Sequence, residues 1–72
     1  MRVHVDYHSP NAGKTVAEID LPAQAVLIAI YEDDTLIIPH GDTVVRPGQY
    51  VLAFADDDAM RELNRIFGSG LA

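Results

Sequence analysis

Residues 36–54, LIIPHGDTVVRPGQYVLAF, decide the fold of this chain. An apolar run enters a turn at residues 39–42, and a second turn at residues 47–48 leads into another apolar run. Proline presets φ for a turn, glycine accepts positive φ, and β-branched and aromatic residues fill the runs between the turns. The pattern predicts a strand, a turn, a short strand at residues 44–45, a turn and a last strand.

Two segments upstream of this stretch also predict strands. Residues 3–8, VHVDYH, alternate with period two and predict a strand near residues 2–8. Residues 25–31, AVLIAIY, form an apolar run that predicts a strand buried on both faces. Residues 32–34, EDD, form the polar tip of a hairpin, and residues 35–38 form its return strand. Between the first two strands, a turn cluster leads into a short helix over residues 14–19.

The chain ends in an amphipathic helix predicted over residues 57–67. Aspartates at residues 56–58 open it, where carboxylates can cap free N–H groups at the positive end of the helix dipole. Its apolar stripe, which we assign to the core, is Ala59, Met60, Leu63, Ile66 and Phe67. Gly68 closes the helix as a C-cap, and residues 68–72 are expected to form a frayed tail.

These elements predict an α+β fold: a small, mostly antiparallel β-sheet with a short crossover helix and a C-terminal helix on one face, in the order β-α-β-β-β-α. Residues 1–72 are expected to form a single domain, which at this size removes only about 60 % of its unfolded surface from water. The last strand, residues 50–55, is apolar on both faces, and one long helix covers only one of them. We therefore predict a two-fold homodimer that buries the other face, with Val51 among the outward residues.

The composition excludes several classes of function. The chain has no cysteine, which excludes disulfides, thiolate metal sites and a cysteine nucleophile. Its net charge of -6 repels phosphate backbones, so nucleic acid is not an expected partner. The longest apolar run, residues 25–31, is far shorter than the ~20 residues that span a bilayer. We expect a cytoplasmic domain that reaches the membrane only through another chain or another part of its own.

Residues that could carry catalysis or bind a metal are few. His4, Asp6 and His8 alternate, but the two histidines would lie about 13 Å apart along an extended strand, so we interpret them as facing solvent. The acidic tip at residues 32–34 lacks the further oxygen ligands of a calcium site. Ser9 beside His8 has no oriented third group. We predict no enzymatic activity, no catalytic residue and no metal site.

Residues 38–48, IPHGDTVVRPG, resemble the Ile-Pro-x-Gly-Asp-x-Val-x-x-Pro-Gly sequence of the TrkA-C (RCK_C) family, the C-terminal half of regulators of potassium conductance. The order and spacing of the other segments, from the opening strand to the acidic start of the last helix, are also similar to that family. The family usually has Asp after the last glycine, where this chain has Gln49.

The resemblance implies a non-catalytic regulatory domain that dimerises and senses small ligands in the cleft between subunits. Such a domain serves a potassium or other cation channel, transporter or antiporter at the inner face of the membrane, often through an attached nucleotide-binding domain. By this resemblance the ligand-binding residues are Val16, Ala17 and Pro39, with His40 beside them in the turn.

Some members of the family bind cyclic di-AMP, and their contact residues can be compared with the matching positions of this chain. Val16 and Ala17 match the apolar contacts of those members, and Pro39 matches their proline. The family's three polar contacts fall on residues of other types, namely Pro22, Val26 or Leu27, and Glu32 or Asp33. This departure and the acidic charge argue against cyclic di-AMP and favour a cation or a neutral ligand, with no cofactor.

Two alternative functions remain open. A swapped-hairpin transcription regulator also dimerises and also uses a hairpin rich in proline and glycine, but its DNA-facing loops are basic. An assembly domain that binds no ligand would share the fold and the dimer.

Overall fold

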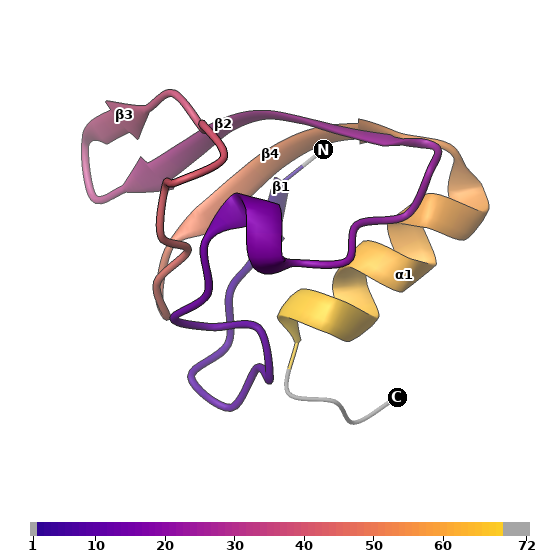
Figure 1. Ribbon diagram of the computed structural model, residues 1–72, viewed down its shortest axis with the longest axis horizontal. Coiled ribbons are helices and arrows are strands. Elements are labelled where there is room, and N and C mark those ends of the chain that lie inside the picture. Colours follow the sequence, from indigo (N-terminus) through magenta and orange to yellow (C-terminus); the bar gives the residue numbers. More distant parts are fainter. Residues whose placement is uncertain (1, 69–72) are drawn as a thin grey trace.

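In the computed structural model, which describes residues 2–68, four antiparallel strands form one sheet. The sheet has the order β1-β4-β2-β3, with strands β1 (Arg2–His4), β2 (Ala25–Glu32), β3 (Thr35–Ile37) and β4 (Tyr50–Ala55). A 3₁₀ helix, η1 (Val16–Glu18), precedes β2, and helix α1 (Asp57–Phe67) follows β4. Figure 1 shows η1 and α1 on the same side of the sheet. The predicted α+β fold and its order of elements are confirmed.

The buried face of the sheet, which we call the inner face, carries most of the core. Val3, Val51 and Ile30 are neighbours across β1, β4 and β2, and all three are buried. The predicted stripe of α1 is buried as well, with Leu63 and Phe67 fully enclosed. The prediction that Val51 points outward was therefore wrong, because alternation determines which residues share a face but not which face receives the helix.

The opposite face of the sheet, which we call the outer face, lies open within the single chain. Phe54, Val26 and Tyr50 point to this side and are 73 %, 63 % and 42 % exposed. A bulge between Leu27 and Ala29 adds one residue to β2. The pairing with β4 shifts there by one residue, from Leu27 opposite Ala53 to Ala29 opposite Leu52. The prediction that β2 is buried on both faces thus fails for one chain, since no element of the described residues covers the outer face.

Two predicted strands are shorter than expected, because other segments take their backbone bonds. β1 ends at His4, since the next two N–H groups donate to Gln49 O and to Phe67 O at the end of α1, both at 2.8 Å. The predicted short strand at residues 44–45 is reduced to an isolated bridge between Thr15 and Val44. Each segment leaves the sheet where a helix or loop offers a partner.

The ends of α1 are capped at both sides, as the sequence predicted. The carboxylate of Asp56 accepts a hydrogen bond from Ala59 N at 2.8 Å. At the other end, Gly68 N donates to Asn64 O at 2.9 Å, with an ordinary negative φ. A Cβ at residue 68 would lie 2.5 Å from that carbonyl oxygen, so close approach explains the glycine. The frayed tail was predicted over residues 68–72; residues 69–72 lie outside the described residues.

A core substitution in α1 tests this packing. We expect Leu63→Ala to lower the free energy of unfolding by about 2–5 kcal/mol, because it leaves a cavity where a fully buried side chain stood. The exposed neighbour gives the control, Asn64→Ala, which should change stability by less than about 0.5 kcal/mol. Urea unfolding followed by circular dichroism at one protein concentration measures both. Equal effects of the two substitutions would contradict the packing described here.

Candidate functional site

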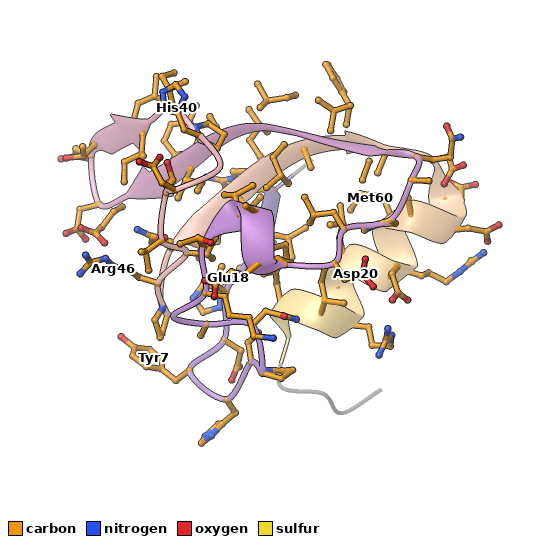
Figure 2. All side chains as sticks on the ribbon, viewed as in Figure 1. Tyr7, Glu18, Asp20, His40, Arg46 and Met60 are labelled. Carbon is orange, nitrogen blue, oxygen red and sulfur yellow. The ribbon has the colours of Figure 1, made fainter. Side chains whose placement is uncertain are left out.

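The two segments that carry the predicted ligand-binding residues lie against each other. Ala17 N donates to Gly41 O and Val16 N donates to Thr43 O, both at 2.9 Å, so η1 is bonded to the turn that contains Pro39 and His40. Val16 and Pro39 are half-buried, and Ala17 and His40 are exposed. Figure 2 shows His40 near β3, on the side of the sheet away from α1. We call this surface the η1–turn site; its occupation by a ligand stays a prediction.

A capping box fixes the start of η1. The carboxylate of Glu18 accepts hydrogen bonds from Thr15 N at 2.9 Å and from the Thr15 hydroxyl at 3.0 Å. The Thr15 hydroxyl in turn accepts one from Glu18 N at 3.3 Å. The bond from the Thr15 backbone, followed by the bond from its side chain, holds the pKa of Glu18 below its usual value. These bonds set the orientation in which Val16 and Ala17 meet the turn.

The turn at residues 39–43 is closed by hydrogen bonds between His40 and Thr43. His40 N donates to the Thr43 hydroxyl at 2.9 Å, and Thr43 N donates to His40 O at 3.1 Å. A Cβ at Gly41 would lie 3.6 Å from the Cβ of Ala17, an ordinary contact. The close fit of η1 on the turn therefore comes from backbone bonds and leaves the imidazole of His40 free to face solvent.

Gln49, the residue at which this chain departs from the family sequence, is a buried anchor that sequence reasoning missed. It is 2 % exposed, and its side-chain oxygen accepts a hydrogen bond from Arg46 N at 2.8 Å. Its side-chain nitrogen donates to the carboxylate of Glu32 at 3.0 Å. Gln49 thus ties the turn around Gly48, which has a φ of +87°, to the end of β2. Its place directly after a Pro-Gly turn was the signal available in the sequence.

The alternating histidines do not gather around a common point. The ring of His4 lies 5.0 Å from the ring of Tyr50 on the outer face, measured between centroids. Asp6 accepts a hydrogen bond from His8 N at 2.8 Å in the loop after β1. Among residues 2–68, no group of three or more histidines, aspartates or glutamates is placed to hold a metal ion.

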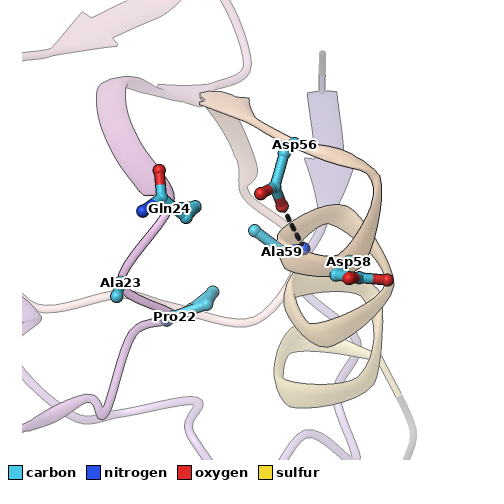
Figure 3. Close-up of a pocket in the computed structure, with 6 residues that line it drawn as sticks. All are labelled: Pro22, Ala23, Gln24, Asp56, Asp58 and Ala59. Carbon is cyan, nitrogen blue, oxygen red and sulfur yellow. Dashed lines mark hydrogen bonds between the residues drawn. The ribbon is translucent and has the colours of Figure 1, made fainter.

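Two surface pockets lie away from the η1–turn site. The first, of about 270 Å³, is at the start of α1 and is shown in Figure 3; Pro22, Ala23, Gln24, Asp56, Asp58 and Ala59 line it. Its Asp56 already caps the helix. The second, of about 300 Å³, is lined by Pro10, Asn11, Asp20, Glu62, Arg65 and Ile66, and its Arg65 is paired with Glu62. Neither contains any of the predicted ligand-binding residues.

The helices of residues 2–68 include none with the length and apolar character of a membrane span.

Comparison with known sequences finds one family. The family model of the TrkA-C domain matches residues 1–68. A Trk system potassium uptake protein TrkA homolog of Pyrococcus horikoshii is 34 % identical over 67 residues, which make up 92 % of this chain and 29 % of that protein. The Trk system potassium uptake protein TrkA of Halomonas elongata is 33 % identical over 60 residues, 82 % of this chain and 13 % of that protein. The chain spans less than a third of the length of these relatives.

Comparison with solved structures finds the same fold. An RCK domain with cda has a TM-score of 0.81 and 18 % identity, over 93 % of this chain and 94 % of that one. The RCK_C domain dimer of S. agalactiae BusR in complex with c-di-AMP has a TM-score of 0.82 and 23 % identity, over 93 % and 92 %. BusR in complex with its busAB-promotor DNA matches with a TM-score of 0.83 and 22 % identity, over 96 % of this chain and 35 % of that one. At these identities the likeness establishes a shared fold.

The capping box predicts a dependence of stability on pH. Because the pKa of Glu18 is lowered in the folded chain, its contribution to stability is present above the pKa of the unfolded chain and is lost as the pH falls through the lower folded value. We expect the stability advantage of the wild type over Glu18→Gln to be small and to shrink on acidification. Thermal unfolding at several pH values measures it, with Asp20→Asn as the control for an exposed carboxylate outside the box. A constant difference at every pH would refute the assignment.

The Gln49 anchor predicts that the residue usual in the family destabilises this chain. Gln49→Asp shortens the side chain, removes the donor to Glu32 and places a second carboxylate near it. We expect a loss of about 1–3 kcal/mol in the free energy of unfolding, with partial recovery in the double variant Gln49→Asp and Glu32→Gln. Urea unfolding of Gln49→Asp, of Glu32→Gln and of the double variant measures the coupling. Purely additive effects would show that the contact between residues 49 and 32 contributes nothing.

Proposed function

Because this chain belongs to the TrkA-C domain family, we propose that it is a non-catalytic regulatory domain of a potassium or other cation transport system. The family match over residues 1–68 and the Trk relatives support this role. The domain acts in the cytoplasm, at the inner face of the membrane, on a channel or transporter subunit or on an attached nucleotide-binding domain. The channel or transporter subunit, and not this domain, moves the cation.

The η1–turn site is the proposed sensor. The observation that carries it is the bonding of Ala17 to Gly41 and of Val16 to Thr43, which joins two distant segments into one surface. A ligand that touches both segments next to a second subunit binds one subunit arrangement more tightly than another. This difference in affinity is the physical requirement for regulation, because equal affinity for both arrangements shifts nothing.

The chemistry of the chain favours a cation or a neutral molecule as the ligand. The net charge of -6 disfavours an anionic nucleotide. Glu32 also disfavours an anionic ligand. Its carboxylate lies at the end of β2, at one of the positions matched to the family's polar contacts, and it accepts a hydrogen bond from Gln49. Cyclic di-AMP is the second candidate, and it has one specific observation in its favour: the BusR RCK_C domain dimer, which has the same fold, is in complex with c-di-AMP.

Nucleic acid is not part of the proposal. BusR is a DNA-bound protein with the same fold in one part, but this chain matches only 35 % of that BusR chain. The acidic balance of the present chain opposes contact with a phosphate backbone. The swapped-hairpin regulator is disfavoured on the same ground, whereas an assembly domain without a ligand differs only in what the η1–turn site does.

The site is tested in the complete transport system by placing a charge on it. We expect Ala17→Glu to abolish the response of cation flux to ligand conditions, because the carboxylate occupies the exposed surface where η1 meets the turn. The matched control is Ala23→Glu, an exposed alanine outside the site, which should leave the response intact. Flux is measured across series of K⁺, Na⁺ and cyclic di-AMP. Unchanged flux and gating in Ala17→Glu would leave the assembly domain as the function, and a response to cyclic di-AMP alone would select the second ligand.

A further inference from the structure

We propose that the second surface pocket, between the C-terminal half of α1 and the loops on either side of η1, binds a small zwitterion with one ammonium group and one carboxylate. We call it the α1–loop pocket; its residues are Pro10, Asn11, Asp20, Glu62, Arg65 and Ile66. It shares no residue with the η1–turn site, so the inference stands apart from the proposed function.

The walls of the α1–loop pocket are joined by hydrogen bonds between segments far apart in the sequence. Asn11 Nδ2 donates to Ile66 O at 2.9 Å, and the buried hydroxyl of Ser9 donates to the same oxygen at 2.7 Å. The Ser9 hydroxyl also accepts a hydrogen bond from Asn11 N at 3.1 Å. These bonds hold the loop against the helix without a ligand, and a preformed pocket loses little conformational freedom when a ligand binds.

The size of the pocket suits a molecule no larger than an amino acid. Its volume of about 300 Å³ lies at the lower end of the range for small-molecule sites. Pro10 and Ile66 add apolar surface to its lining, which can contact the methylene groups between two charged ends. Both features favour a short aliphatic ligand with polar termini.

Arg65 retains hydrogen-bond donors for the carboxylate of such a ligand. A guanidinium has five N–H donors in a planar fork. Arg65 Nε and Nη2 donate to the two carboxylate oxygens of Glu62, the former at 3.0 Å. The edge formed by Nη1 and Nη2 has no partner among residues 2–68, and the side chain is 67 % exposed. A carboxylate can accept two parallel hydrogen bonds from this edge.

Asp20 supplies the opposite charge from a different segment. It lies two residues after the end of η1 and is exposed, and Figure 2 shows it in the loop beside α1. In the described part of the chain, its carboxylate takes part in no hydrogen bond or ion pair. An ammonium group can donate to this carboxylate while the other end of the same molecule is bound by Arg65.

The charges around the α1–loop pocket balance, unlike those of the chain as a whole. Asp20 and Glu62 contribute two negative charges and Arg65 one positive charge. Lys14 contributes a second positive charge next to the pocket, because its ammonium group donates to Asn11 Oδ1 at 3.3 Å. The rest of the chain therefore carries the whole net charge of -6, which repels a multivalent anion. A zwitterion has no net charge and is not repelled.

Substitutions on both charged walls test the assignment. We expect Asp20→Asn and Arg65→Gln each to raise the dissociation constant of the zwitterion about tenfold or more, because each removes a charge-assisted hydrogen bond. Arg61→Gln is the matched control, since Arg61 forms the same kind of exposed pair with Asp58 one turn earlier on α1 and lies outside the pocket. It should change the dissociation constant less than twofold. Circular dichroism checks that all three variants fold.

Binding is measured by titrating the 72-residue chain with glycine, β-alanine and 4-aminobutanoate, whose charged groups are spaced differently, and following amide shifts by NMR. We expect at least one of them to saturate, with the largest shifts around residues 11, 20 and 65. Its dissociation constant should be at least tenfold lower than those of sodium acetate and methylammonium chloride, which each carry one of the two charges.

Four results would overturn the inference. They are saturation by none of the three zwitterions, equally tight binding of acetate or methylammonium, the largest shifts at residues 39–43, and an equal loss of affinity in Arg61→Gln. The regulatory role is judged separately, by the flux response of Ala17→Glu.

Discussion

One constraint shapes this domain: a four-stranded sheet has two faces, and residues 2–68 contain one long helix to cover them. The inner face is closed by α1, which contacts β1 and β4, and Leu63 and Phe67 are fully buried in the shared core. The loop after η1 adds Ile19 to the same core, and the segment between β3 and β4 adds Val45. No element among residues 2–68 covers the outer face, which leaves Phe54, Val26 and Tyr50 exposed.

Backbone hydrogen bonds outside the sheet organise the rest of the molecule. They bring η1 onto the central turn, and they draw the chain after β1 onto the end of α1. Buried side chains reinforce them, since Ser9 donates to Ile66 O at 2.7 Å and Gln49 joins its turn to β2. These hydrogen bonds therefore connect the loops to the strands and to α1.

The chain matches the TrkA-C family over residues 1–68 but differs from the usual family sequence at Gln49. The family match covers residues 1–68, and the aligned residues make up less than a third of the Trk relatives. Gln49 stands where the family usually has an aspartate, and it forms a hydrogen-bonded pair with Glu32. An aspartate at position 49 would place a second carboxylate beside Glu32, whereas Gln49 donates a hydrogen bond to it.

The sequence by itself determined the element order, the caps of α1, its buried stripe and the partition of β4 into two sets of side chains, because local periodicity and capping act over a few residues. Only the tertiary structure decided that the set containing Val51 faces the helix, since both sets are equally apolar. It also ended β1 at His4, where Phe67 O competes for the backbone. The contact of Ala17 with Gly41 was likewise beyond local pattern, because segments 24 residues apart (41 − 17) meet only when the whole core has formed.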